Sequence, residues 1–330
     1  MKKLVTLFLL MASFSAFGQE LNRLYNLRGD WKFSIGDHKE WATTAYDDTD
    51  WEEIYVPRRW EREGFNGYDG YAWYRLHVSG DEFLQNRVHY LSLGYIDDAD
   101  QVFFNGQLIG FSGGFPPEYY TAFQAKREYR IPDELINFGG DNLIAVRVFD
   151  KGGEGGIYSG DVGLFVGDDD YQEVINLKGL WKLRLRDNKD YADPDYQDED
   201  WELIMVPANW RVKGIYNYRD IAWYRHEFVV PENSNLERMV FVAGYIDDFD
   251  ATYLNGEKIG ETYDGLGLGR SRSFQELRVY DIPEGLLKSG RNVVSIRVED
   301  IGDNGGIYKG PVAIIPEKLL TTYLRSSYWR

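Results

Sequence analysis

The chain has 330 residues, which is long enough for two domains of ordinary size. Its formal charge is −17, from 54 acidic and 37 basic residues. Nucleic acids and anionic membranes bind to basic surfaces, so the charge argues against both as partners. The chain has no cysteine, which excludes disulfides, a thiol nucleophile and a zinc–thiolate site. Its 4 histidines lack the spacing of metal ligands.

The first 18 residues have the features of a secretory signal peptide. Lys2-Lys3 precede the apolar run Leu4–Phe14, and Ala16-Phe17-Gly18 offers small residues at the cleavage positions. The apolar run is too short to span a membrane. The sequence therefore predicts a cleaved signal peptide at residues 1–18, no membrane span, and a secreted or periplasmic mature protein that begins at Gln19.

The rest of the chain contains one pattern twice. Tyr95–Gly110 and Tyr245–Gly260 align without a gap, at an offset of 245 − 95 = 150 residues. In both copies an Asn-Gly pair stands between two strand-like segments, as a type I′ hairpin turn requires. Other pairs at this offset include Gly29–Phe33 with Gly179–Leu183, Val56-Pro57 with Val206-Pro207, and Trp73-Tyr74-Arg75 with Trp223-Tyr224-Arg225. A repeat of this length indicates a duplicated domain rather than a solenoid.

Short alternating segments separated by turn residues, with almost no helical periodicity, predict an all-β protein. We expect two tandem jelly-roll β-sandwiches, at residues 19–167 and 168–316. The acidic stretch 167–170 is predicted to be the linker, and residues 317–330 a tail that is either a short helix or frayed. The loops at 113–117 and 264–270 differ most between the copies, so differences in binding are expected there.

A set of motifs recurs across both units. In the first they are Val56-Pro57…Trp60, Trp73-Tyr74-Arg75, Asn105-Gly106…Ile109-Gly110, Asn142…Val146-Arg147-Val148 and Gly156-Ile157-Tyr158…Val162. Together they resemble the sugar-binding domain of family 2 glycoside hydrolases. The second unit, through Ile246-Asp247-Asp248-Phe249-Asp250…Asn255-Gly256 and Ile282-Pro283…Arg297-Val298, also resembles a domain of sialate O-acetylesterases. The resemblance covers nearly the whole mature chain and implies tandem galactose-binding-like domains in a carbohydrate context.

Neither unit contains recognisable catalytic machinery. In the glycosidases that the units resemble, the catalytic carboxylates lie on a separate barrel of about 250 residues, for which two jelly rolls leave no room. Gly110-Phe111-Ser112-Gly113-Gly114 matches the G-x-S-x-G pattern of serine esterases. The proline pair 116–117 forbids the helix that must follow such a serine. We therefore expect no catalytic residue.

Acidic, aromatic and glycine-flanked residues are the candidates for ligand binding. The triplets Asp97-Asp98-Asp100 and Asp247-Asp248-Asp250 could accept hydrogen bonds from sugar hydroxyls, hold a structural Ca²⁺ ion, or pair with Arg75, Arg147, Arg225 and Arg297. Aromatic residues in loops could stack on sugar rings, and glycines beside Asp150 and Asp300 would let a ligand approach. The predicted ligand-binding residues are Trp60, Tyr71, Asp97, Asp98, Asp150, Tyr158, Trp210, Tyr218, Asp247, Asp248, Asp300 and Tyr308. Apart from the Ca²⁺ alternative, no metal or cofactor is expected.

These observations favour an exported, non-catalytic protein that binds an oligo- or polysaccharide. One shallow sugar site would have a dissociation constant of about 1 mM, and two linked sites could gain avidity. A first alternative is a structural subunit that docks on a separately encoded glycosidase. A second is a glycoside hydrolase that acts on β-galactoside-type glycans through carboxylates between the units.

Overall fold

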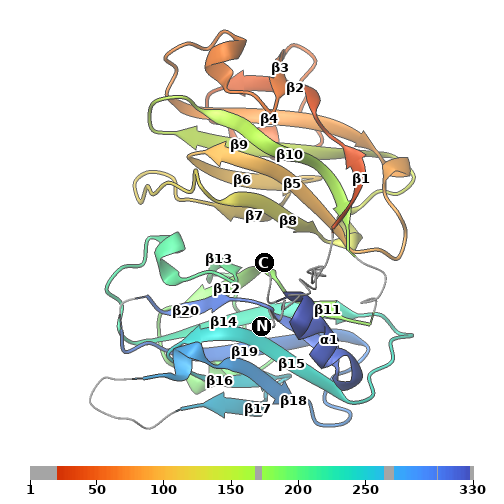
Figure 1. The fold of residues 1–330 in the computed structure, drawn as a ribbon, viewed down its shortest axis with the longest axis vertical. Coiled ribbons are helices and arrows are strands. Elements are labelled where there is room, and N and C mark those ends of the chain that lie inside the picture. Colours follow the sequence, from red (N-terminus) through yellow and green to blue (C-terminus); the bar gives the residue numbers. More distant parts are fainter. Residues whose placement is uncertain (1–20, 168–172, 264–270, 303, 328–330) are drawn as a thin grey trace, which may run out of the picture.

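The computed structural model describes residues 21–167, 173–263, 271–302 and 304–327, and the strands of these ranges form four antiparallel sheets (Figure 1). Every strand pair joins strands of the same half of the chain. The predicted all-β fold of two β-sandwiches is therefore confirmed. The predicted signal peptide, residues 168–170 of the predicted linker and the loop 264–270 lie outside the described residues.

The first half contributes a four-stranded and a six-stranded sheet, in the orders β1-β10-β5-β8 and β3-β2-β4-β9-β6-β7. The strands are β1 (Asn22–Asn26), β2 (Gly29–Ile35), β3 (Glu52–Val56), β4 (Gly70–Ser79), β5 (His89–Asp97), β6 (Ala99–Phe104), β7 (Gln107–Ser112), β8 (Lys126–Ile131), β9 (Asp141–Asp150) and β10 (Gly156–Val166). Short 3₁₀ helices connect them at η1 (Lys39–Ala42), η2 (Trp60–Glu63), η3 (Gly80–Glu82) and η4 (Asp133–Leu135).

The second half repeats this plan. Its six-stranded sheet has the order β13-β12-β14-β19-β16-β17, and its five-stranded sheet has the order β11-β21-β15-β18, with β20 also paired to β15. The strands are β11 (Ile175–Asn176), β12 (Gly179–Arg184), β13 (Glu202–Val206), β14 (Ile221–Val230), β15 (Met239–Asp247), β16 (Phe249–Leu254), β17 (Glu257–Thr262), β18 (Leu277–Asp281), β19 (Gly290–Glu299), β20 (Gly306–Lys309) and β21 (Ala313–Pro316). The helices are η6 (Lys189–Ala192), η7 (Trp210–Lys213), η8 (Ser273–Gln275) and α1 (Glu317–Ser327).

The alternation of apolar residues explains the two cores. In β2, Trp31 and Phe33 are buried between the sheets, whereas Lys32 between them points outward. Both Asn-Gly pairs form the predicted tight hairpins, with positive φ angles of 48° and 84° at Asn105 and Gly106 and of 49° and 86° at the second pair.

The described part of the C-terminal tail is helical. Leu319, Leu320 and Leu324 of α1 pack beside the buried Tyr323 on residues of β15 and β21, so the helix covers the outer face of the five-stranded sheet. No helix of the described residues is long and apolar enough to cross a membrane.

The two sandwiches touch where β7 of the first lies against β12 of the second (Figure 1). Asn176 links them, because its side-chain amide donates to the Tyr90 hydroxyl (2.7 Å) and its carbonyl accepts from Arg130 (3.1 Å). Met205 packs against the core of the first sandwich. This contact sets the walls of the cleft described below.

Candidate functional site

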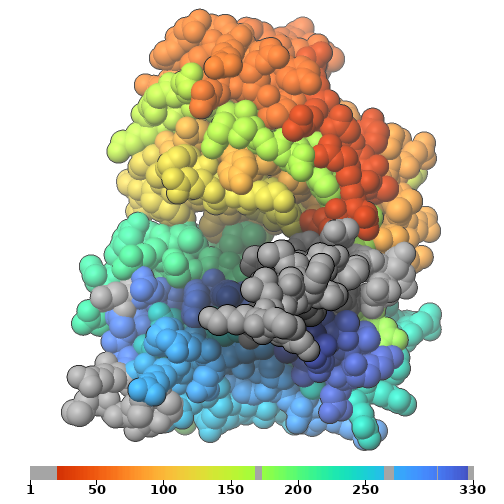
Figure 2. Space-filling model, in the orientation of Figure 1, coloured from red at the N-terminus to blue at the C-terminus, as the bar shows by residue number. Residues whose placement is uncertain are grey.

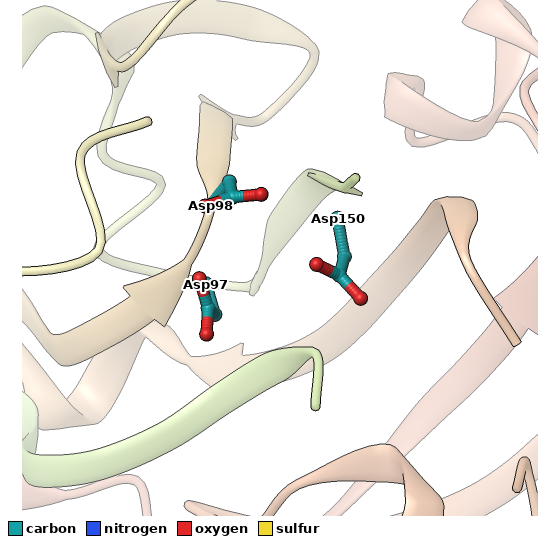
Figure 3. Close-up of side chains that lie close together, drawn as sticks. All are labelled: Asp97, Asp98 and Asp150. Atoms are coloured by element: carbon teal, nitrogen blue, oxygen red, sulfur yellow. The ribbon is translucent and has the colours of Figure 1, made fainter. Parts of the chain in front are cut away.

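Three of the predicted acidic residues come together at one end of the first sandwich. Asp97 ends β5, Asp98 follows it, and Asp150 ends β9. Because β5 belongs to one sheet and β6 and β9 to the other, the chain crosses between the sheets here. One carboxylate oxygen from each residue lies within 4.8 Å of the other two, and Figure 3 shows the three side chains facing a common space. We call these residues the first acidic cluster.

Asp98 is held as a carboxylate. Its Oδ2 accepts hydrogen bonds from the Tyr119 hydroxyl (2.7 Å) and the Lys151 backbone N–H (3.1 Å). Burial opposes ionisation of Asp98, but these bonds and one from Thr121 outweigh it and lower the pKa of this carboxyl. Burial, together with the adjacent charge of Asp98, raises the pKa of Asp97 to about 7.

Asp150 is fully buried, and only one of its two carboxylate oxygens accepts a hydrogen bond from a described residue. Its Oδ1 accepts from the Gly152 N–H (3.0 Å), whereas its Oδ2 has no hydrogen-bond partner among the described residues. Burial raises the pKa of Asp150 to about 6 despite that hydrogen bond, and the charges of Asp98, Asp69 and Glu61 add to the shift.

The second half repeats the arrangement with Asp247, Asp248 and Asp300, the second acidic cluster. The Ile301 N–H donates to Asp248 (3.1 Å), and burial with the charge of Asp248 raises the pKa of Asp247 to about 7. In both halves, therefore, the structure brings together the acidic pair that ends a strand and the aspartate before the glycine-rich loop.

The third members of the sequence triplets belong to the core instead. Asp100 and Arg127 are both fully buried and paired, with 2.6 Å between Oδ1 and Nε. Asp250 and Arg278 repeat the pair at 2.9 Å.

The pairing of the triplets with four predicted arginines is wrong. Each of those arginines has a partner in a more N-terminal loop of its own half; the pairs are Arg75 with Asp48, Arg147 with Asp37, Arg225 with Asp198, and Arg297 with Asp187.

Trp60 and Trp210 are not stacking platforms, which corrects the interpretation of these two residues. Their exposed fractions are 0% and 1%, so neither ring can meet a ligand from solvent. Each ring packs beneath the glycine-rich loop of its half, where a Cβ on Gly155 or Gly305 would lie about 2 Å from it. The loop backbone thus closes over the tryptophan, and glycine is required because any side chain would collide with the ring.

The four predicted tyrosines are half-buried and brace loops. The hydroxyls of Tyr158, Tyr218 and Tyr308 donate to backbone carbonyls at 3.2, 2.9 and 2.6 Å. Tyr71 stacks on Phe115, with 5.9 Å between ring centroids, and lies beneath the Arg147 guanidinium. Their rings and hydroxyls are largely engaged within the protein.

An aromatic-lined cleft between the sandwiches contains none of the predicted site residues. It has a volume of about 810 Å³. One wall is formed by the end of β7, the loop 113–125 and β8; the other is formed by residues 205–216. In Figure 2 these segments face each other where the yellow part of the chain meets the green part. The lining residues are Phe111, Ser112, Gly113, Tyr120, Thr121, Ala122, Phe123, Gln124, Ala125, Lys126, Glu128, Tyr129, Met205, Pro207, Ala208, Arg211, Val212 and Tyr216.

The cleft presents free ring surface beside polar groups. Phe123 is 40% exposed and Tyr216 is 55% exposed. Tyr120 lies near Tyr216, and burial together with this neighbour raises the pKa of Tyr120. The exposed guanidinium of Arg211 forms no ion pair within the described ranges. Such a surface can stack on an apolar face of a ligand while donating hydrogen bonds to its polar edge.

Ser112 lies in this cleft but not in a nucleophile elbow. It is the last residue of β7, its hydroxyl lies 2.8 Å from that of Tyr129, and the next strand, not a helix, begins at Lys126. The expectation from the sequence that this serine is not an esterase nucleophile agrees with that geometry.

Comparison with known proteins relates the chain to parts of larger enzymes. No family model matches it. It is 30% identical over 138 residues to a putative beta-glucuronidase of Formosa agariphila, a match that covers 38% of this chain and 12% of that protein. It is 24% identical over 141 residues to the beta-galactosidase BoGH2A of Bacteroides ovatus, covering 39% of this chain and 16% of that protein.

Solved structures give weaker likenesses. Beta-glucuronidase 2 of Bacteroides uniformis, at 16% identity and a TM-score of 0.39, covers 91% of this chain and 28% of its own. The match to a putative beta-galactosidase of Bacteroides fragilis has 18% identity and a TM-score of 0.36, and it covers 86% of this chain and 36% of that protein. Scores this low add nothing to the sequence matches. From those matches, the chain contains a segment similar to part of family 2 glycoside hydrolases and spans less than a fifth of the length of either relative.

Proposed function

We propose that this chain is a non-catalytic carbohydrate-binding protein that recognises a glycan in the cleft between its two sandwiches. The proposal rests on one observation above all, the exposed rings of Phe123 and Tyr216 in a cleft of about 810 Å³. Sugar rings have apolar C–H faces and polar edges, so they suit a flat aromatic surface flanked by hydrogen-bonding groups.

The polar groups of the cleft favour a neutral or sparsely charged glycan. Arg211, Gln124 and Thr121 offer donors for sugar hydroxyls or for the carboxylate of an acidic sugar. The net charge of −17 opposes binding of a densely charged polyanion. The names of the two relatives make β-galactosides and β-glucuronides the first glycans to try.

The absence of a catalytic role is part of the proposal. Glycoside hydrolysis needs two carboxyl groups across the scissile bond. Among the described residues that line the cleft, Glu128 is the single acid, and it is paired with Lys126 at 3.0 Å. The proposal also includes export, for which the support is the signal-peptide pattern of residues 1–18.

A glycan array that contains β-galactosides, β-glucuronides and their polysaccharides tests this proposal. We expect saturable binding to at least one glycan that is lost in Tyr216→Ala and Phe123→Ala, because both changes remove stacking surface. Tyr25→Ala is the matched control, since Tyr25 is 39% exposed but lies outside the cleft. A blank array with folded protein would contradict the proposal and favour a structural subunit that docks on a glycosidase.

A further inference from the structure

The spacing of the first acidic cluster suits one small cation. One carboxylate oxygen each from Asp97, Asp98 and Asp150 lies within 4.8 Å of the other two. Ca²⁺ binds oxygen at about 2.3–2.6 Å, so two ligands on opposite sides of the ion lie about 4.6–5.2 Å apart. A single ion can therefore reach all three carboxylates from the space that they face in Figure 3.

The carboxylates of this cluster have no ion-pair partner of their own among the described residues. No basic residue in the described ranges forms an ion pair with Asp97, Asp98 or Asp150. Arg127 donates to the backbone carbonyl of Asp98 (3.0 Å), but its Nε is committed to Asp100. The three carboxylates therefore lie close together without an ion pair to a basic side chain of the described residues.

One oxygen in the cluster has no hydrogen-bond partner among the described residues. Asp150 has an exposed fraction of 0%, and its Oδ2 accepts no hydrogen bond from any residue that the structure describes. Figure 3 shows one oxygen of the Asp150 carboxylate on the side that faces Asp97 and Asp98. A cation would stabilise such a carboxylate, which is buried beside two further acids and has an oxygen without a partner among the described residues, because burial of an uncompensated charge is strongly unfavourable.

Two more acids surround the first cluster. Glu61 accepts from the Gly155 N–H (3.0 Å) through Oε1, while its Oε2 is buried and has no partner in the described part of the chain. Gly155 lies against Asp150, since a Cβ there would be 2.9 Å from Asp150 Oδ2. Asp69 lies beside the same loop, 3.8 Å from the Cβ position of Gly152.

The second cluster lacks these two acids. At the offset of 150 residues, Glu61 and Asp69 correspond to Arg211 and Arg219. The second cluster therefore lacks the two additional carboxylates that lie near the first. Because electrostatic attraction grows with the negative charge around the ion, we expect a cation to be attracted more strongly to the first cluster.

We propose that Asp97, Asp98 and Asp150 form a binding site for a divalent cation, with Ca²⁺ the preferred ion, and that the second cluster binds it more weakly. An all-carboxylate site favours hard cations over zinc. Ca²⁺ tolerates an irregular oxygen shell, whereas Mg²⁺ demands near-octahedral geometry. This ligand set differs from the sequence triplet, because Asp100 is engaged by Arg127 and Asp150 takes its place.

Calorimetric titration of the EDTA-treated, dialysed protein with CaCl₂ tests the proposal. We expect one ion per chain and a rise in Tm of a few degrees in CaCl₂ relative to EDTA with NaCl at equal ionic strength. Asp150→Asn should abolish the heat and the Tm rise, while the matched Asp300→Asn should keep both. In EDTA, Asp150→Asn should be at least as stable as the wild type, because it removes an uncompensated buried charge.

Several outcomes would overturn the proposal. These are no binding heat, an equal Tm rise in NaCl, or unchanged Ca²⁺ binding by Asp150→Asn. Two equivalent ions per chain would overturn the preference for the first cluster. If Asp150→Asn does not fold, Asp97→Asn replaces it, since Asp97 is partly exposed and its substitution disturbs the core less.

Discussion

Arg127 joins the acidic cluster, the cleft wall and the core of the first sandwich, so its removal is a sharp test of the structure. The side chain is fully buried. Its Nε bonds to Asp100 Oδ1 at 2.6 Å, and its Nη1 donates to the carbonyls of Ala122 and Ala125 at 2.5 Å each. Arg127→Met keeps most of the side-chain volume. It leaves the buried Asp100 carboxylate without its ion-pair partner and removes the hydrogen bonds that hold the loop carrying Phe123.

The expected loss of stability follows from these contacts. Each hydrogen bond to a charged group contributes about 1.5–3 kcal/mol, although such values do not add. Breaking a buried ion pair by removing one partner costs about 3–5 kcal/mol. The Tyr129 hydroxyl, which donates to Asp100 Oδ2 at 2.6 Å, compensates only in part. We therefore expect the first sandwich to lose about 3–5 kcal/mol of unfolding free energy.

Urea unfolding followed by tryptophan fluorescence measures this loss. Lys126→Met is the matched control on the same strand. Its ammonium pairs with Glu128 at 3.0 Å, but the side chain is 52% exposed, so the cost should stay below about 1 kcal/mol. Arg278→Met repeats the test in the second sandwich and identifies the transition that belongs to each unit. A loss below about 1 kcal/mol for Arg127→Met would refute the reasoning.

Three further predictions concern stability. Burial and the charge of Arg130 lower the pKa of His226 to about 4. As the pH falls below about 6.5, this histidine is protonated in the unfolded chain but stays neutral in the folded chain. The free energy of unfolding should therefore fall by about 2–3 kcal/mol between pH 7 and 4.5. Urea unfolding of His226→Gln should show a smaller fall, and an equal fall would exclude this histidine as a cause. Trp60→Ala should cost about 3–5 kcal/mol in the same assay, and the protein that remains folded should bind glycan normally, as fits a core residue. Gly155→Ala should cost about 1–3 kcal/mol because its Cβ would lie 2.1 Å from the Trp60 ring, whereas Gly139→Ala, with open space around it, should not collide.

Local chemistry made the fold predictable from the sequence. The Asn105-Gly106 pair requires left-handed backbone at both positions, and the alternation around Trp31 requires a half-buried strand. The offset of 150 residues then extended each inference to the second half. The same local reasoning placed the acidic pairs at strand ends, where the structure has them.

Features that depend on long-range packing were not predictable. Glycine near Trp60 suggested an exposed loop, but that glycine loop folds over the ring and buries it. Arg75 pairs with Asp48, 27 residues away, through a loop whose path has no periodic signal. The cleft needs residues of both sandwiches, so it exists only once their relative placement is known. The exposed aromatic pair Phe123 and Tyr216 could have been noticed in the sequence only as aromatics in variable loops.

Calorimetric titration of the wild type and Tyr216→Ala with soluble β-galactoside and β-glucuronide oligosaccharides tests the central claim most directly. We expect saturable binding with a dissociation constant near 1 mM that weakens at least tenfold, or by about 1.4 kcal/mol, in Tyr216→Ala and is unchanged in Tyr25→Ala. Equal binding by the wild type and Tyr216→Ala, or no binding by either, would contradict a glycan site in the cleft.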